Sequence, residues 1–170
     1  MMSLVFDTDI ISTFGKIKRL DLLKDLFPNT RFFIPPSVYN ELFKARERGY
    51  EFVDYVIESG ILEVASLNKE ELELLSELKE ERRSLGLGEL EGVSICKHRE
   101  YILVTNDRAA KKVCDQYGIE FIDLRMILKS LLIAEILTDN ELKALIYEIE
   151  RRDRVTIKDK GDILRRIRDN

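Results

Sequence analysis

Acidic side chains follow two apolar segments of this sequence, at the point where each segment ends. Asp7 and Asp9 come directly after the apolar run at residues 4–6, and Asp107 follows the run at residues 102–105. If both runs are neighbouring strands of one parallel sheet, their carboxyl ends meet at one edge, which is where such sheets bind ligands. We therefore expect the carboxylates of Asp7 and Asp107 to project into the same crevice.

Glu41 is a third candidate because of its position in a predicted helix. This helix follows the apolar run at residues 32–34, and Val38 and Ala45 mark its apolar stripe. Glu41 lies three residues after Val38 and four before Ala45, so helical periodicity places it on the sheet-facing side. A carboxylate that faces inward needs a cation or several hydrogen-bond donors.

The segment at residues 86–92 supplies a fourth carboxylate, for which two residues compete. Glu89 lies four residues before Val93, on the apolar stripe of the helix that follows, whereas Glu91 shares a side with Ile95. Helical periodicity therefore favours Glu89 as the inward-facing residue and keeps Glu91 as the alternative.

The available donors limit the kind of ion that these residues could bind. His98 is the only histidine, and the two cysteines, Cys96 and Cys114, have neither CxxC spacing nor a partnering histidine. A structural zinc site and a disulfide framework are therefore not expected. Clustered carboxylates raise one another's pKa values unless a cation lies among them, and oxygen-only clusters suit Mg²⁺ or Mn²⁺. Such a cluster predicts metal-assisted phosphodiester hydrolysis.

Each carboxylate also has an ordinary structural interpretation. Asp7, at the end of a strand, could be a turn residue, and Asp9 could be a helix N-cap. Asp107 could cap the helix that begins at residue 108. Glu41 could pair with Lys44 or Arg48. Each interpretation accounts for one residue, whereas a shared site accounts for all of them at the same edge of one sheet.

The elements that position these residues alternate between short apolar strands and amphipathic helices. Strands are predicted at residues 3–6, 31–34, 62–65, 102–105 and 120–122. Helices are predicted at residues 9–14, 20–27, 37–48, 50–59, 69–84, 89–98, 108–117, 124–132, 139–152 and 158–168. Apolar strands that alternate with helices predict an α/β fold with a central, mainly parallel sheet of about five strands.

Length and composition favour a single domain. The chain has 170 residues, of which 45% are hydrophobic, as is usual for one compact domain. We expect a core at residues 1–137 and a C-terminal helical hairpin at residues 138–170. No apolar run approaches the ~20 residues that cross a bilayer, and Asp7 interrupts the N-terminal one, so a cytoplasmic protein without membrane association is expected.

Charge is unevenly distributed along the chain. The net charge of −4 argues against a chain-wide electrostatic attraction to nucleic acid. Residues 151–170, however, contain eight basic and four acidic residues. This distribution predicts an acidic centre beside a basic tail at residues 151–170.

Four pieces of the sequence resemble the PIN-domain family, which includes the VapC-like toxin ribonucleases. In chain order they are LVFDTD at residues 4–9, IPPSVYNEL at 34–42, GELEG at 88–92 and LVTND at 103–107. The resemblance spans residues 3 to about 123, with an acidic residue correctly placed in each piece. The Gly-Glu-x-Glu start of the third piece, with the helical C-terminal extension, resembles one prokaryotic branch of the family.

The resemblance implies a three-layer α/β/α sandwich and an endoribonuclease that hydrolyses RNA with water activated by Mg²⁺ or Mn²⁺. Asp7, Glu41 and Asp107 match three of the four acidic residues of the family. The fourth is usually Asp followed by a small residue. An alignment without gaps from Asp107 falls on Glu89, whereas Glu91 fits the "acidic then small" pattern better but needs a two-residue deletion.

Further roles are expected around these residues. We expect an extra or substitute ligand from Glu91, Asp9 or Asp123, and the resemblance implies that Thr105 and Asn106 form hydrogen bonds close to the metal. Near the site, Arg108, Lys111 and Lys112 are weaker candidates for contacts with RNA phosphates.

The partners that the resemblance implies are RNA, a second copy of this chain in a homodimer, and a small antitoxin protein. A VapC-like toxin is blocked by an antitoxin, whereas a stand-alone RNA-processing enzyme has none, and the sequence is consistent with both. The apolar residues of the C-terminal helices either complete the core or form a dimer interface; they are Leu142, Leu145, Ile146 and Ile149.

Two other functions stay open on the sequence. A PIN fold that binds RNA or a protein without cutting it is compatible with the departure at Glu89 and with the acidic net charge. The run at residues 7–9 also resembles the first motif of haloacid-dehalogenase phosphatases, in which the first Asp is a nucleophile. That family offers no role for Glu41, and the residues around Asp107 are not a close match to its later motifs.

Overall fold

The computed structural model describes residues 1–165, which form a three-layer α/β/α sandwich around a parallel sheet. The strands are β1 (Ser3–Phe6), β2 (Arg31–Ile34), β3 (Leu62–Val64), β4 (Ile102–Val104) and β5 (Phe121–Ile122). Their order is β3-β2-β1-β4-β5, and all four neighbouring pairs are parallel. The predicted fold class is therefore confirmed, with β1 at the centre of the sheet.

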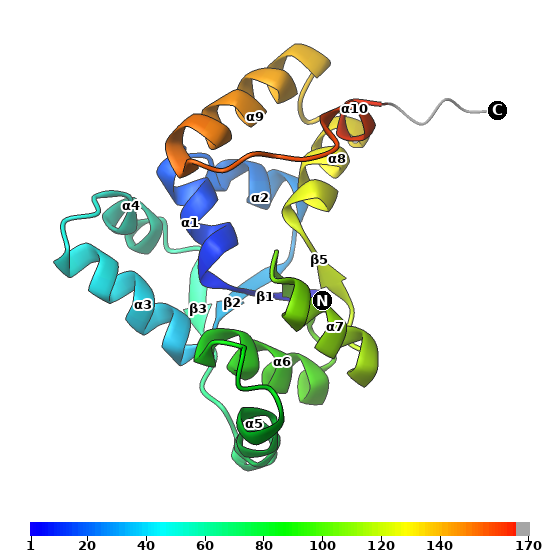
Figure 1. Cartoon of the computed structure of the whole chain (residues 1–170). Helices are drawn as coiled ribbons and strands as arrows, with labels where there is room; N and C mark the ends of the chain where they lie inside the picture. The colour runs from blue at the N-terminus through cyan, green and yellow to red at the C-terminus, as the bar shows by residue number, and fades with distance from the viewer. Residues whose placement is uncertain (166–170) are drawn as a thin grey trace.

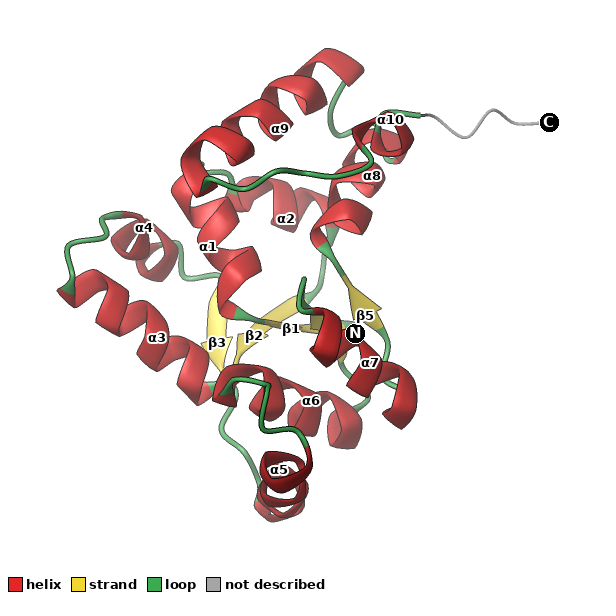
Figure 2. Ribbon diagram, in the orientation of Figure 1, coloured by secondary structure: helices red, strands yellow, loops and turns green. Residues whose placement is uncertain are grey.

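Alternating side chains of the strands build one hydrophobic core on each face of the sheet. Leu4 and Phe6 of β1 lie in a core shared with α1, α2, α8 and α9, whereas Val5 lies in the opposite core with α5, α6 and α7. Figure 2 shows these two groups of helices above and below the strands. Because both faces are covered, the central strands β1 and β4 are almost entirely apolar, whereas the edge strand β3 carries the exposed Glu63.

Ten helices occur within the described residues. They are α1 (Thr8–Lys16), α2 (Leu20–Leu26), α3 (Pro36–Glu47), α4 (Phe52–Glu58), α5 (Lys69–Glu81), α6 (Leu87–Arg99), α7 (Arg108–Tyr117), α8 (Leu124–Ile133), α9 (Asp139–Asp153) and α10 (Lys160–Ile163). The first nine end within about three residues of their predicted boundaries. Within residues 1–165, no helix combines the length and the apolar character needed to cross a bilayer.

The C-terminal region differs from the predicted pair of long helices. The helix expected at residues 158–168 is a single turn, Lys160–Ile163, that packs on α8, and residues 166–168 of that prediction lie outside the described part. The apolar face of α9 belongs to the core of its own chain, as Leu142 and Ile149 are fully buried there. That face therefore completes the core and does not form a dimer interface.

Gly92 allows α6 to pack closely on the sheet. A Cβ atom at this position would lie 2.8 Å from Cδ1 of Leu103 on β4 and 3.8 Å from Cγ1 of Val5 on β1. The first distance is shorter than real Cβ contacts, so only glycine fits without displacement. Since α6 also carries Glu89, this close packing sets the distance between that carboxylate and the edge of the sheet.

Gly92→Ala is expected to lower the free energy of unfolding by about 1–3 kcal/mol, because the added methyl group overpacks the core against Leu103. Gly161→Ala is the matched control, since a Cβ at Gly161 meets nothing within 4 Å. Denaturant unfolding of both variants measures the effect. Equal stability of Gly92→Ala and wild type would contradict this account of the packing.

Candidate active site

The ends of β1 and β4 bring two of the predicted carboxylates to one edge of the sheet. Phe6 pairs with Val104 at the carboxyl ends of these strands, and the backbone amide of Asp7 donates a hydrogen bond to the carbonyl of Val104 at 3.1 Å. The chain then enters α1 from β1, and α7 a few residues after β4 (Figure 1). Asp7 and Asp107 therefore leave the sheet side by side.

The carboxylate of Asp7 is buried and held by two hydrogen-bond donors. Only 5% of Asp7 is exposed. Its Oδ1 accepts from the amide of Ile10 at 3.2 Å, which makes Asp7 the N-cap of α1, and its Oδ2 accepts from the hydroxyl of Thr105. Burial disfavours the charged form and raises the pKa of Asp7 to about 7, although both hydrogen bonds act in the opposite direction. Asp9, which could have been the N-cap, lies in the first turn of α1.

Thr105 connects the two strand ends. Its fully buried hydroxyl donates to Asp7 and accepts from the amide of Asp107 at 3.1 Å. Asp107 is also the N-cap of α7, so its structural role and its place at the edge of the sheet coincide. The side chain of Asn106 bonds to a different element: its Oδ1 accepts from the amide of Leu124 at 3.0 Å, which ties this loop to α8.

A small pocket of about 50 Å³ gathers carboxylates from α1, α3 and α6. It is lined by Asp7, Thr8, Asp9, Val38, Glu41, Gly88 and Glu89. The absence of a side chain at Gly88 brings α6 close to α3, because a Cβ there would lie 2.9 Å from Cγ2 of Val38 and 3.7 Å from Oε1 of Glu41. Glu41 itself is exposed and accepts a hydrogen bond from the hydroxyl of Thr8, which differs from the sheet-facing position that its periodicity predicts.

Negative charges at this edge act on one another. Burial is the largest cause that raises the pKa of Glu89, and the charges of Asp107, Glu41 and Asp9 raise it further. The pKa of Asp9 is raised first by burial and then by Asp153, with Asp107 adding to the effect. Within residues 1–165, none of the salt bridges involves the carboxylates of the pocket or Asp107. The cluster is therefore negatively charged without a paired cation from the described part of the chain.

Glu91 points away from this pocket. It is 7% exposed, and its carboxylate accepts from the amide of Ser37 at 2.8 Å and from the hydroxyl of Ser37 at 2.9 Å. These two bonds fasten α6 to the first turn of α3. The structure thus brings Glu89 into the pocket and uses Glu91 to hold two of its helices together.

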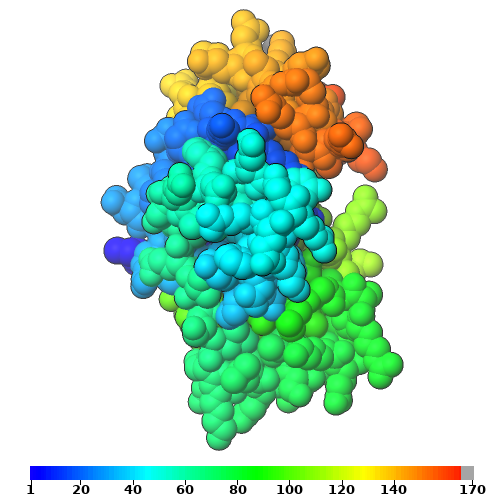
Figure 3. Space-filling model, turned by 90° about the vertical axis from the view of Figure 1, so that its left-hand side faces the viewer, coloured from blue at the N-terminus to red at the C-terminus, as the bar shows by residue number. Residues whose placement is uncertain are grey.

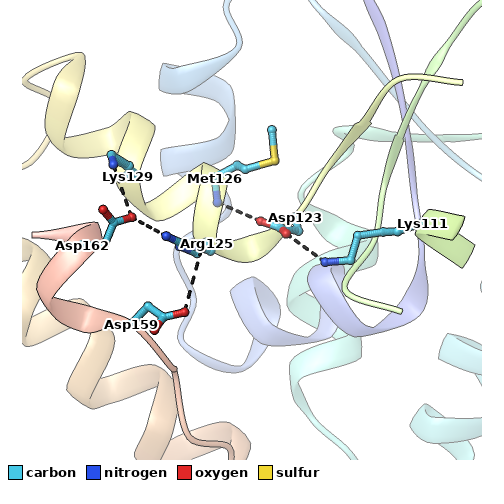
Figure 4. Close-up of polar contacts among 7 residues, drawn as sticks. All are labelled: Lys111, Asp123, Arg125, Met126, Lys129, Asp159 and Asp162. Atoms are coloured by element: carbon cyan, nitrogen blue, oxygen red, sulfur yellow. Dashed lines mark hydrogen bonds and ion pairs between the residues drawn. The ribbon is translucent and has the colours of Figure 1, made fainter. Parts of the chain in front are cut away.

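The remaining sequence candidates do not line the pocket. Asp123 is the N-cap of α8 and pairs with Lys111 at 2.9 Å, as Figure 4 shows, so its carboxylate is already engaged. Arg108 and Lys112 are exposed on α7. The structure therefore does not bring Asp123 among the lining carboxylates.

Sequence reasoning missed two features close to the site. Thr8, whose hydroxyl holds Glu41, stands between two aspartates at the start of a helix, and that position could have indicated its role. Asp153 accepts from Thr13 and Lys16, and its charge reaches Asp9. It lies 140 positions from Thr13, so no local pattern could have revealed it.

The donor chemistry of the pocket fits a hard divalent cation. Its polar side chains are carboxylates and one hydroxyl, and these oxygen donors suit Mg²⁺ or Mn²⁺. As the side chains stand, no group of three or more His, Cys, Asp or Glu within the described part of the chain is arranged to hold a metal ion. The hydroxyl groups of Thr8 and Thr105 donate hydrogen bonds to oxygen atoms of Glu41 and Asp7. Metal binding therefore requires the carboxylates to move toward one another.

Comparison with known families identifies the fold and its membership. A family model described as a PIN domain (DUF3368) matches residues 3–167. The chain therefore belongs to the PIN-domain family, and the resemblance to haloacid-dehalogenase phosphatases is not supported. No curated protein matches the sequence.

Solved structures share the fold at low sequence identity. DNA-bound VapBC from Salmonella typhimurium is 22% identical with a TM-score of 0.58, and the match covers 72% of this chain and 98% of that chain. VapBC2 from Rickettsia felis, bound to a DNA fragment from its promoter, is 19% identical with a TM-score of 0.57 and the same two coverages. A PilT N-terminus domain protein from Sulfolobus solfataricus is 17% identical, with a TM-score of 0.53, and the match covers 77% of this chain and 94% of that chain. These similarities establish a PIN-like α/β/α fold.

The raised pKa of Asp7 makes stability depend on pH. The pKa is about 7 in the folded protein and 3.8 for an ordinary Asp, so the folded state binds this proton more tightly than the unfolded chain does. The contribution of this carboxyl group to stability is therefore fully present below pH ~4 and is lost as the pH rises through about 7.

Asp7→Asn removes this dependence, because Asn keeps a hydrogen-bonding N-cap without a charge. In metal-free buffer at pH 8, we expect the variant to be more stable than wild type by about 1–4 kcal/mol, and the difference should vanish near pH 4. Denaturant unfolding across this pH range measures it. A difference that does not change with pH would show that the charge of Asp7 is not the cause.

Proposed function

We propose that this protein is a divalent-metal-dependent endoribonuclease that hydrolyses RNA phosphodiester bonds. The observation that supports it most is the cluster of carboxylates without a salt-bridge partner at the carboxyl edge of the central strands, in which burial and neighbouring negative charges raise the pKa values of Asp7, Asp9 and Glu89. A bound cation would lower this electrostatic cost, and the phosphodiester group of a substrate would then bind next to the cation. Membership in the PIN-domain family agrees with this chemistry.

The residues that would hold Mg²⁺ or Mn²⁺ are Asp7, Glu41, Glu89 and Asp107, with Asp9 as an extra ligand. When bound, such an ion supplies activation of water and stabilisation of charge on the phosphate. Thr105 orients the carboxylate of Asp7 and fixes its distance from Asp107 through two hydrogen bonds. The protein thus contributes positioning and negative charge, and none of these side chains needs to act as a covalent nucleophile.

The cellular role that we infer is RNA cleavage in the cytoplasm, with a small antitoxin as the partner if the protein is the toxin of a toxin–antitoxin pair. The solved VapBC complexes of related fold make this pairing the first to test. A homodimer remains a proposal, and its interface does not involve the buried face of α9. A PIN fold that binds RNA without cutting it is the alternative, and it deserves a test because no three carboxylates within residues 1–165 are already arranged to hold an ion.

Cleavage of a labelled single-stranded RNA pool tests the proposed activity. With Mn²⁺ or Mg²⁺, wild type should cut, and EDTA or Asp7→Asn should lower the rate at least about a hundredfold. Glu89→Gln should lower it comparably. Glu91→Gln is the matched control on the same helix: it should reduce stability by weakening the contact with Ser37 while retaining most of the activity. Stable RNA binding without cutting by folded wild type would favour the non-catalytic alternative.

Metal binding should also be visible without any activity assay. At an Mn²⁺ concentration about 100 times Kd, the free energy of unfolding of wild type should rise by about 2.7 kcal/mol. Asp7→Asn should gain far less, whereas Asp115→Asn, an exposed carboxylate on α7, should gain as much as wild type. Equal stabilisation of all three proteins would exclude Asp7 as a ligand.

A further inference from the structure

A second and much larger hollow lies next to the acidic pocket. It is a cleft of about 580 Å³, within the range of ~300–1,000 Å³ that is usual for ligand pockets. Its walls are α1, the loop after β4, the first turns of α7 and α8, and the C-terminal segment, by which we mean residues 153–159. Figure 3 shows a notch between the orange-to-red C-terminal residues and the yellow-green residues below them.

The cleft and the acidic pocket share a wall. Asp9 lines both, and Asn106, next to Asp107 in the chain, lines the cleft. A polymeric substrate with one phosphate at the carboxylates must continue beyond them, and the cleft is the larger space that opens on the Asp9 side. If the protein is the proposed nuclease, the RNA strand next to the cut therefore has this cleft as its binding site.

The C-terminal segment is a fixed wall of the cleft. At one end, Asp153 accepts hydrogen bonds from Thr13 and Lys16 of α1. In the middle, the amide of Ile157 donates to Glu150 at 2.8 Å. The side chain of Ile157 is buried in the core, so this stretch cannot leave the surface without exposing it.

The far end of the segment is held by an ion-pair network that Figure 4 shows. Arg125 of α8 contacts Asp159 at 3.9 Å and also pairs with Asp162. Lys129 reaches Asp162 at 3.4 Å. The segment is thus anchored to α1 on one side of the cleft and to α8 on the other.

The cations of the cleft differ in whether they are already paired. Lys16, Lys111 and Arg125 each hold a carboxylate of this chain. Lys158 also lines the cleft and is exposed, yet within residues 1–165 it has no hydrogen bond or ion pair. Its ammonium group is therefore available to a phosphate of a bound strand.

The surroundings of Lys158 suit the other parts of a nucleotide. Thr156 provides a hydroxyl group for hydrogen bonds to a sugar, and Val155, which is 44% exposed, provides an apolar surface for a base. A positively charged groove with surfaces on which bases stack is the combination that binds single-stranded nucleic acid. The lining offers the charge of Lys158 and, in place of an aromatic ring, the apolar side chain of Val155.

We propose that the C-terminal segment forms the binding wall for the RNA strand next to the scissile phosphate, and that Lys158 contacts a backbone phosphate there. This inference rests on the proposed ribonuclease function and assigns its substrate groove. The segment would control affinity for single-stranded RNA, whereas the carboxylates would control cleavage.

Binding can be separated from cutting in an Asp7→Asn background. In it, Lys158→Glu should weaken binding of a fluorescent single-stranded RNA at least about tenfold in an anisotropy titration at low salt. Lys158→Ala should reduce the slope of log Kd against log salt concentration by ~0.7, which corresponds to the loss of one phosphate contact. Lys143→Glu is the matched control, because Lys143 is exposed on α9 outside the cleft.

The outcomes distinguish this proposal from the nuclease function. If the Lys158 and Lys143 variants bind RNA equally well, the groove assignment is overturned, even when wild type cuts RNA with metal. If the Lys158 variants bind weakly but wild type never cuts, the groove stands and the nuclease proposal fails. If the Asp7→Asn protein binds no single-stranded RNA at any salt concentration, the groove assignment is likewise overturned.

Discussion

Unpaired negative charge at the carboxyl edge of the parallel sheet is the constraint on which the site depends. The carboxylate of Asp7 lies at the end of the central strand, almost fully buried, and burial raises its pKa to about 7. Asp107 leaves the adjacent strand beside it, and α3 and α6 bring Glu41 and Glu89 to the same pocket. An arrangement of this kind costs free energy unless donors or a cation offset it.

The chain supplies partial compensation in two forms. Hydroxyl groups of Thr105 and Thr8 donate to Asp7 and Glu41. In addition, Asp7, Asp107 and Glu89 all lie at the amino ends of helices, where the backbone dipole favours negative charge. These effects lower the cost of the clustered charge but add no cationic side chain, and a divalent cation on which the carboxylates converge would complete the compensation.

Much of the fold follows from local sequence patterns, because most strands are short, mainly apolar runs and the helices between them are amphipathic. The positions of Asp7 and Asp107 were predictable for the same reason: strand ends in a parallel sheet share one edge. Periodicity also favoured Glu89, but the role of Glu91 depends on Ser37, 54 positions away, which no local pattern encodes.

The C-terminal region shows the opposite case. The sequence predicts a long helix at residues 158–168, yet Asp159 adopts a positive φ of 55° and α10 lasts one turn. Tertiary contacts decide this outcome, since Ile163 is buried in the core and Asp162 pairs with Arg125 and Lys129. The cleft formed by this segment is likewise a product of contacts between distant parts of the chain.

Anomalous scattering from a crystal soaked with Mn²⁺ would locate the bound ion. We expect a manganese peak at the carboxyl edge of β1 and β4, with oxygen atoms of Asp7, Asp107 and Glu89 within about 2.5 Å and Glu91 still bonded to Ser37. A manganese-loaded crystal in which the ion lies elsewhere, or in which this pocket stays as it is without an ion, would contradict this expectation.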